Sequence, residues 1–308
     1  MVTVFGTEIT GGYVNGEPIE EIYAYGVKVW PENSGTFYIS WTPTSLTGSF
    51  RINGSTYNFE DYNGYFSGFG GVITSQAFIS AGMSTVETNA LEVRSYAFAS
   101  CPSLRTVSMS CCDYLAPMAF NSCSRLRSVS LPVCTVLRAY AFAYCSSLSS
   151  IELPECRRIS NNAFASCTSL TYVSLPKCEY LSTMTFFNCT NLRSIDLPAC
   201  TDIEGGPFMC CTLDSVSLPV CSNANGVFYQ CTIPTVDLPA CTFVGNYTFV
   251  GVISSIYLRA SSVCSIASGP VFADDISEYS VFVPASLVSD YKNDSGWSRY
   301  SSWIYPIE

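Results

Sequence analysis

Apolar and polar positions alternate in short runs that return at a fixed interval along most of the chain. In one such run Val129 and Leu131 are apolar, while their neighbours are serine and proline. Alternation with a period of two predicts a short strand with inward apolar side chains. Pro132 ends that strand because it cannot donate to a ladder. The segment around Phe142 is predicted to be a short helical or 3₁₀ turn that packs its phenylalanine against the strand layer.

A phenylalanine marks the period of this pattern. It recurs every 22 residues and then after intervals of 20 and 21, at Phe98, Phe120, Phe142, Phe164, Phe186, Phe208, Phe228 and Phe249. Fixed periods of about 20–50 residues are typical of solenoids, whose units are too small to bury a core alone. The sequence therefore predicts a stacked solenoid held together by a column of buried phenylalanines.

The spacing of apolar residues within one unit is L-x-x-V-x-L-P-x-C-x-x-L, from Leu126 to Leu137. It matches the leucine-rich repeat pattern, and it recurs in the following units. The predicted fold is mainly β with short helical or 3₁₀ turns, a leucine-rich repeat solenoid of about eight 20–22-residue units. The predicted segments are an N-terminal β-hairpin attachment segment (1–32), a small β module and N-terminal cap (33–87), the solenoid (88–264) and an aromatic C-terminal cap (265–308).

Cysteine follows the same period. One series lies three residues after each repeat phenylalanine and a second lies seven or eight residues before it, which leaves only Cys111, Cys210 and Cys264 of the 17 cysteines outside. Equivalent side chains on successive parallel rungs point the same way, about 4.8 Å apart, whereas a disulfide needs its Cβ atoms near 3.8 Å and facing each other. We expect buried thiols rather than disulfides. A zinc site is disfavoured because a column does not converge on a tetrahedron.

Charge and residue types exclude several functions. The net charge of −10, from 14 basic and 24 acidic residues, opposes binding to nucleic acid. The chain has no histidine, which removes Ser-His-Asp, Cys-His and histidine–metal sites. No catalytic residue, metal or cofactor is predicted, and enzyme activity on polysaccharide or peptidoglycan is kept only as a third hypothesis.

The sequence also bears on location. No stretch approaches the roughly 20 apolar residues that span a bilayer, and the polar start MVTVFGTEIT lacks the features of a secretory signal. Membrane insertion is therefore not expected. The protein is expected either to stay in the cytoplasm where it is made or to leave by a route that needs no signal.

The repeats resemble the BspA-like leucine-rich repeat family, common in surface proteins of gut Bacteroidetes. The resemblance covers about 180 residues and is carried by units such as Ala163-Phe164-Ala165-Ser166-Cys167-Thr168-Ser169-Leu170, followed by Thr171-Tyr172-Val173-Ser174-Leu175-Pro176. The ending, with Val281-Phe282-Val283-Pro284 and Trp297, is similar to the tail that often closes such arrays. The resemblance implies adhesion to host or matrix proteins.

The N-terminal segment carries a different resemblance. Tyr13-Val14-Asn15-Gly16, followed by Ile22-Tyr23 and Gly26-Val27-Lys28-Val29-Trp30-Pro31, is similar to a segment of bacteriophage structural and tail proteins from phages of gut bacteria. Asn-Gly also predicts a tight hairpin turn. The resemblance implies attachment to other virion proteins. The candidate attachment residues are Tyr13, Asn15, Gly16, Tyr23, Tyr25 and Trp30.

The outward positions of the repeat strands are the candidate binding surface. Tyrosine and arginine are frequent interface anchors, and the outward charges lean basic in the first units and acidic in the later ones. The candidate residues are Arg105, Arg127, Glu152, Tyr172, Arg193, Asp196, Asp214, Asp237 and Tyr257. An ordinary solvated sheet face is the alternative.

Two functional hypotheses follow from the sequence. The preferred one is a non-enzymatic structural and adhesion protein of a phage virion, in the tail or as a head decoration, whose repeats bind a host-surface glycan or protein. It would be assembled in the host cytoplasm as a homo-oligomer within the particle. The alternative is a BspA-like adhesin on a bacterial cell surface that binds host or matrix proteins.

Overall fold

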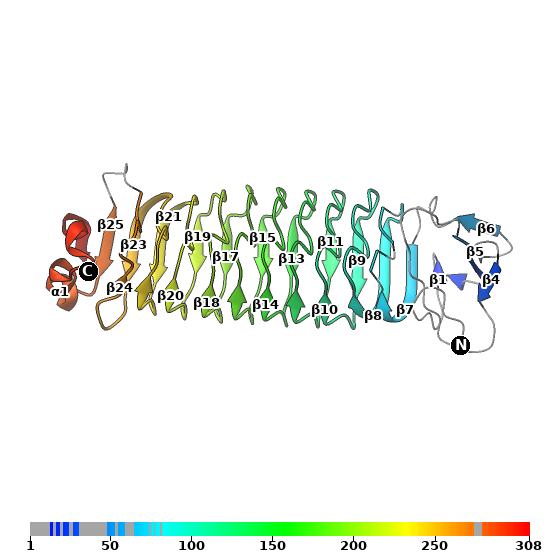
Figure 1. Ribbon diagram of the computed structural model, residues 1–308, viewed down its shortest axis with the longest axis horizontal. Helices are drawn as coiled ribbons and strands as arrows, with labels where there is room; N and C mark the ends of the chain where they lie inside the picture. The colour runs from blue at the N-terminus through cyan, green and yellow to red at the C-terminus, as the bar shows by residue number, and fades with distance from the viewer. Residues whose placement is uncertain are drawn as a thin grey trace. The chain divides into compact units, whose positions relative to one another are not determined.

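The computed structural model describes the strands between residues 13 and 73, and then residues 75–76, 78–80, 82–273 and 279–308. The chain divides into two compact units, residues 1–154 and residues 155–308. In each unit successive turns of the chain add short parallel strands to two series (Figure 1). The mainly β solenoid predicted from the period is confirmed.

The first strands of unit 1 are antiparallel. β1 (Tyr13–Val14) and β2 (Glu17–Pro18) pair with Val14 opposite Glu17, which confirms the predicted hairpin. A separate antiparallel sheet follows, in the order β4-β3-β5-β6. Its strands are β3 (Glu21–Ala24), β4 (Val27–Trp30), β5 (Gly48–Ile52) and β6 (Ser55–Asn58).

The rest of unit 1 is parallel. The longer series consists of β7 (Tyr65–Ile73), β8 (Thr85–Val93), β9 (Thr106–Met109), β11 (Ser128–Ser130) and β13 (Ser150–Glu152). The shorter series, β10 (Tyr114–Leu115) and β12 (Val136–Leu137), continues from the end of β8. Parallel pairing starts with β7 and β8, so the parallel series includes a turn of the chain before residue 88, the predicted start of the solenoid.

Unit 2 repeats this arrangement. Its longer series is β15 (Tyr172–Ser174), β17 (Ser194–Asp196), β19 (Ser215–Ser217), β21 (Thr232–Leu238), β23 (Val252–Leu258), β25 (Ser280–Val283) and β26 (Ile304–Pro306). Its shorter series is β14 (Arg158–Ile159), β16 (Tyr180–Leu181), β18 (Asp202–Ile203), β20 (Asn223–Ala224), β22 (Phe243–Val244) and β24 (Ser265–Ile266).

The predicted phenylalanine column lies at the centre of each unit. In unit 1 the rings of Phe98 and Phe120 stack at 5.0 Å between centroids, and those of Phe120 and Phe142 at 5.3 Å. Phe78, which precedes the regular period, stacks on Phe98 at 5.0 Å. In unit 2 the stack is formed by the pairs Phe164–Phe186, Phe186–Phe208, Phe228–Phe249 and Phe249–Phe272. Burial and stacking of these rings stabilise the contact between turns.

The segments that carry the phenylalanines differ in detail from the expected helical or 3₁₀ turns. Two residues on either side of the ring the backbone is left-handed, as at Tyr96 (φ 60°) and Ser100 (φ 58°) around Phe98. This geometry makes consecutive β-turns, whose N–H groups donate to the next turn, as Phe98 N does to Ala119 O at 2.8 Å. Left-handed backbone costs a non-glycine residue about 1–2 kcal/mol, and these ladder hydrogen bonds offset it.

All seventeen cysteines lie in the described part of the chain, and each is a thiol. In the series after the phenylalanines, the thiol donates to the phenylalanine carbonyl of the preceding turn, as Cys123 Sγ does to Phe98 O at 3.0 Å. In the other series it donates to the carbonyl two residues on, as Cys178 Sγ does to Tyr180 O at 3.3 Å. The thiols therefore fill the core and add a hydrogen bond to buried carbonyls.

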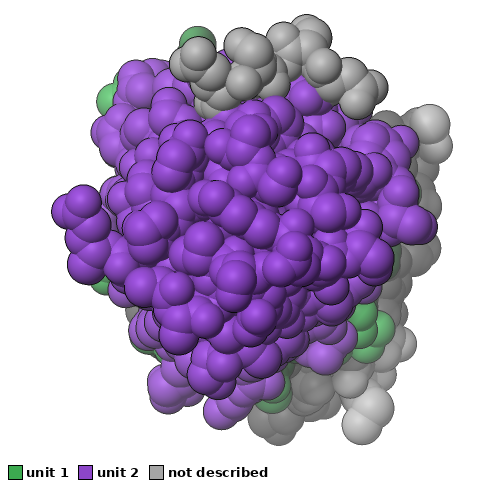
Figure 2. Space-filling model, turned by 90° about the vertical axis from the view of Figure 1, so that its left-hand side faces the viewer, with its two compact units in different colours: residues 1–154 green, residues 155–308 purple. Residues whose placement is uncertain are grey.

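The predicted aromatic cap closes the C-terminal end of unit 2. It contains η1 (Ala285–Leu287), α1 (Val288–Asn293) and η2 (Ser298–Trp303). Trp297 Nε1 donates to Cys264 O at 2.6 Å, and the Tyr291 hydroxyl accepts from Cys264 N at 2.8 Å. Figure 2 looks onto this end, where side chains of unit 2 cover the core. Both aromatic side chains are fully buried.

Candidate binding surface on the longer strands

We call β9, β11 and β13 of unit 1 and β15, β17, β19, β21 and β23 of unit 2 the face strands. Along β13, β17 and β19 one buried apolar residue stands between two exposed residues. The exposed positions are in register from turn to turn: Ser130 is opposite Glu152, and Asp196 is opposite both Ser174 and Ser217. Each unit thus presents rows of outward side chains about 4.8 Å apart.

A shallow groove lies along the face strands of each unit. The groove of unit 1 has a volume of about 300 Å³ and is lined by Arg127, Ser128, Ser130, Pro132, Ser150, Glu152 and Pro154, among others. The groove of unit 2 has a volume of about 290 Å³ and is lined by Tyr172, Ser174, Pro176, Ser194, Asp196, Pro198 and Ser217, among others. These volumes are at the lower end of ligand pockets, about 300–1,000 Å³. Each groove could therefore hold a small part of a larger ligand.

Several charged side chains of the candidate surface keep their hydrogen-bonding capacity. Among the described residues, no ion pair or side-chain hydrogen bond involves the charged groups of Arg105, Arg127, Glu152, Asp196 or Asp214. Arg127 N donates to Arg105 O at 2.9 Å, and Asp214 N donates to Arg193 O at 2.6 Å, so each pair of residues lies on adjacent turns. The structure therefore gathers these predicted residues on the face strands or directly before them.

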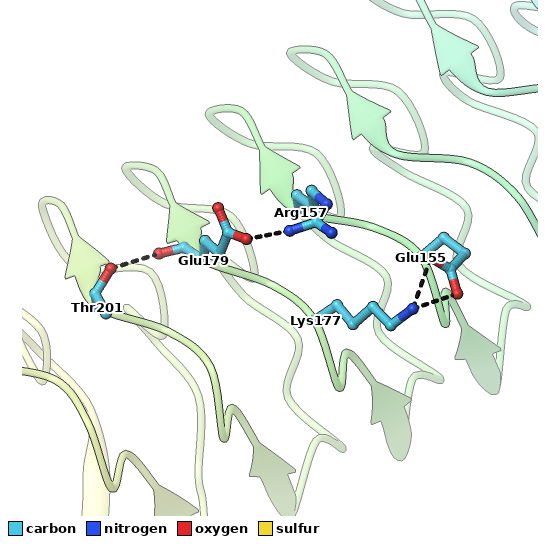
Figure 3. A network of polar contacts seen from close by, with 5 residues as sticks. All are labelled: Glu155, Arg157, Lys177, Glu179 and Thr201. Atoms are coloured by element: carbon cyan, nitrogen blue, oxygen red, sulfur yellow. Dashed lines mark hydrogen bonds and ion pairs between the residues drawn. The ribbon is translucent and has the colours of Figure 1, made fainter.

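Four charged residues that lie just before the shorter strands of unit 2 are instead paired with each other (Figure 3). Arg157 donates to Glu179, and Lys177 Nζ lies 2.6 and 2.8 Å from the carboxylate oxygens of Glu155. Thr201 Oγ1 donates to the backbone carbonyl of Glu179. These groups link adjacent turns, and each exposed pair contributes about 0–1 kcal/mol. These four groups are therefore less available to a ligand than the charges of the face strands that have no partner.

Two predicted residues are engaged within the protein. Asp237 accepts from Arg259 Nε with both carboxylate oxygens at 2.9 Å. The Tyr257 ring lies 4.7 Å from the Phe282 ring and 4.9 Å from the guanidinium of Arg259. These contacts leave Asp237 and Tyr257 half-buried. By contrast, Tyr172 is 49% exposed.

Sequence reasoning missed the wall of each groove. The pattern predicts only that the prolines at 132, 154, 176 and 198 end strands, but their constant place after each strand also puts them in the groove walls beside the exposed row. The repeated L-P step was the available signal. Arg125 was also missed, because its charge lies outside the alternating run.

Thiol chemistry is confined by burial. Only Cys111 and Cys210 are exposed, while their neighbours Cys112 and Cys211 are buried. Burial raises the pKa of Cys112 and of Cys211 to about 12, so these buried thiols stay protonated and are poor nucleophiles. In the described ranges no group of three or more Cys, Asp or Glu could hold a metal ion.

The candidate attachment residues lie at the start of unit 1. Tyr13, Tyr23 and Trp30 belong to β1, β3 and β4. Asn15, Gly16 and Tyr25 lie outside the described residues. Their role in attachment stays a prediction.

Comparison with known proteins identifies the repeats. A family model described as "BspA type Leucine rich repeat region" matches residues 71–155 and 135–256, with six copies, over more than half of the chain. The chain belongs to this family. The match begins at residue 71, so it gives no support to the resemblance of the first 31 residues to phage proteins. No curated protein matches the sequence.

Several solved structures are similar to this chain. A leucine-rich cell surface protein of Faecalibacterium prausnitzii has 15% identity and a TM-score of 0.32, covering 74% of this chain and 95% of its own. A leucine-rich repeat protein from Bacteroides ovatus has 16% identity and a TM-score of 0.38, covering 94% and 99%. The pneumococcal vaccine antigen PcpA has 13% identity and a TM-score of 0.38, covering 90% and 87%. The family assignment rests on the repeat match alone.

The described helices are all short. In that part of the chain none has both the length and the apolar character needed to cross a membrane.

Proposed function

We propose that this chain is a non-enzymatic recognition protein of a bacterial cell surface, and that its face strands bind a host or matrix component. One observation carries the proposal: both units present a groove lined by exposed hydroxyls, carboxylates, arginine or tyrosine. The family resemblance implies adhesion, and a rigid stack of turns suits an extended binding surface.

The absence of enzyme activity is part of this proposal. The sequence has no histidine to serve as a general base. The only exposed thiols, Cys111 and Cys210, lie outside both grooves. The grooves offer serine hydroxyls and carboxylates, but within the described residues no base lies in hydrogen-bonding contact with a groove serine to activate it. Binding is the function these groups support.

The virion hypothesis is the second candidate and rests on residues 13–31 alone. It adds two proposals: attachment to other virion proteins through that segment, and a homo-oligomer within the particle. Deleting residues 1–32 should prevent incorporation into a particle, and a melting curve of the shortened chain verifies that the repeats stay folded without the pairing of β1 to β7. Incorporation without that segment would contradict the virion hypothesis.

Display on a non-adherent bacterium tests the main proposal. Cells that carry the chain fused to an unrelated outer-surface anchor are expected to bind fibronectin-, collagen- or mucin-coated surfaces and epithelial cells better than cells carrying the anchor alone. Equal retention of both strains on every surface would contradict the proposal. A melting curve of the purified chain verifies that the displayed protein is folded.

A further inference from the structure

Three arginines of unit 1 differ from the other arginines in the described part of the chain. The side chains of Arg105, Arg125 and Arg127 are exposed and have no ion-pair, hydrogen-bond or ring partner there. The other arginines whose side chains the structure describes, between residues 82 and 308, are engaged with carboxylates, a tyrosine hydroxyl, aromatic rings or backbone carbonyls. Three cations without partners in a chain of net charge −10 point to a ligand that supplies the negative charge.

These three side chains lie close together. Arg127 N donates to Arg105 O at 2.9 Å, which places the two residues at equivalent positions on adjacent turns. Arg125 is separated from Arg127 only by Leu126, which is fully buried. Arg125 lies in the turn that the hydrogen bond from Leu126 N to Cys123 O closes at 3.0 Å, two residues before Arg127, and both arginine side chains are exposed. The three residues form a cluster that we call the arginine corner.

Hydroxyl groups continue from the arginine corner across the face strands. Thr106 is in register with Ser128, and Ser108 with Ser130. The groove of unit 1, with a volume of about 300 Å³, begins at Arg127 and includes both of those serines. Each hydroxyl both donates and accepts hydrogen bonds. A ligand whose anionic group is bound at the corner would therefore extend over a row of hydroxyls that can hydrogen-bond to neutral sugar hydroxyls.

Carboxylates limit the positive surface along the stack. Glu87 is in register with Ser108, and Glu152 with Ser130, so each lies on the turn just beyond the two arginine-bearing turns. Neither carboxylate pairs with an arginine of the corner. The positive surface thus covers two turns. Its extent matches one or two anionic groups of a ligand rather than a long row of them.

We infer that the arginine corner and the adjoining groove bind an acidic polysaccharide, with sulfate or carboxylate groups on the arginines and sugar hydroxyls on the serines. Guanidinium groups bind sulfate and carboxylate through paired, charge-assisted hydrogen bonds. A peptide bound through its main chain would need an open strand edge, and β9 and β11 are paired on both sides. The inference gives a ligand class to the proposed recognition function and rests on it for its biological setting.

Binding of the full chain to dextran sulfate tests the inference, with neutral dextran and poly-glutamate as comparison ligands. The test variant is Arg105→Gln/Arg125→Gln/Arg127→Gln. The matched control, Arg94→Gln/Arg138→Gln/Arg158→Gln, removes the same charge from arginines that have partners at Glu92, Tyr114 and Tyr180. Ser128→Asp, which places a carboxylate beside the corner and keeps all three arginines, is a second independent variant.

The unchanged chain is expected to bind dextran sulfate more tightly than poly-glutamate, and not to bind neutral dextran. The test triple and Ser128→Asp are each expected to weaken binding about tenfold or more, which corresponds to about 1.4 kcal/mol, while the control triple stays within about twofold of the unchanged chain. Raising the salt concentration from about 0.05 M to about 0.5 M is expected to weaken binding strongly.

Failure to bind dextran sulfate, or equal losses in both triples, would overturn the inference. Binding to poly-glutamate that is stronger than binding to dextran sulfate would also overturn it, and would favour an acidic peptide as the ligand. The adhesion assay separates this result from the proposed function. If the displayed test triple adheres as well as the unchanged chain, the recognition function stands without the polysaccharide site. If dextran sulfate binding depends on the arginine corner but displaying cells adhere to none of the tested surfaces, the polysaccharide site stands without the proposed recognition function.

Discussion

Replacing Phe120 with alanine tests the energetic basis of the stack. The ring is fully buried and stacks between two others, 5.0 Å from Phe98 with an interplanar angle of 2° and 5.3 Å from Phe142 with an angle of 4°. Truncation removes the transfer free energy of the ring, leaves a cavity and breaks both stacking contacts. Phe→Ala changes in cores cost about 3–5 kcal/mol, and double stacking places Phe120→Ala at the upper end of that range.

Guanidinium denaturation followed by circular dichroism measures this loss. Tyr144→Ala is the matched control, because Tyr144 is an aromatic residue of the next turn of the same unit with 52% of its surface exposed. A φ of 62° is as unfavourable for alanine as for tyrosine, so the free energy of unfolding should fall by less than about 1 kcal/mol. Equal losses in the two variants, or a loss below about 1 kcal/mol for Phe120→Ala, would refute the claim that the ring column holds the turns together.

Three further predictions address the thiols and the turns. Burial raises the pKa of Cys112, Cys134 and Cys221 from the ordinary 9.0 to about 12. Because the folded pKa is above the unfolded one, the contribution of these thiols to stability is complete below about pH 9. It falls by about 1.4 kcal/mol per thiol per pH unit as the pH rises toward 12. Urea midpoints across this range should decline, less steeply in Cys112→Ala/Cys134→Ala, and a constant midpoint would contradict the assignment. In the native protein a thiol reagent should react quickly with Cys111 and Cys210 only, and with all 17 cysteines in denaturant; fast native labelling of Cys111→Ser/Cys210→Ser would show that the core thiols are accessible. Gly251→Ala should lower stability by about 1–3 kcal/mol, because its Cβ would lie 2.2 Å from the Cys231 carbonyl oxygen; Gly269→Ala, which meets the movable amide of Asn246, should cost less, and the opposite order would count against the packing of these turns.

The periodic parts of the fold were predictable because the signal is repeated. The phenylalanine period gives the column, the alternating runs give the face strands, and the double cysteine series predicts burial. The turn geometry was not predictable in the same way. Left-handed backbone usually selects glycine, yet Tyr96, Ser100 and Met118 occupy such positions. The hydrogen bonds that stabilise them come from the next turn and leave no local mark in the sequence.

The candidate surface shows the same division. Alternation is enough to place Tyr172 and Asp196 outward. It could not show that Asp237 is bound by Arg259, which lies 22 residues later. That contact follows from the register between turns. The arginine corner depends on the same register, since only stacking brings Arg125 and Arg127 beside Arg105.

The most direct test of the account compares the two sides of unit 2 in the adhesion assay. Tyr172→Ser/Asp196→Asn removes one tyrosine and one charge from the groove of the face strands. Tyr180→Ser/Asp202→Asn removes the same groups from β16 and β18, on the shorter strands. The account predicts that retention of displaying cells falls about tenfold or more for the first variant and stays unchanged for the second. Equal retention of both variants, or a selective loss for the second, would contradict the claim that the face strands are the recognition surface.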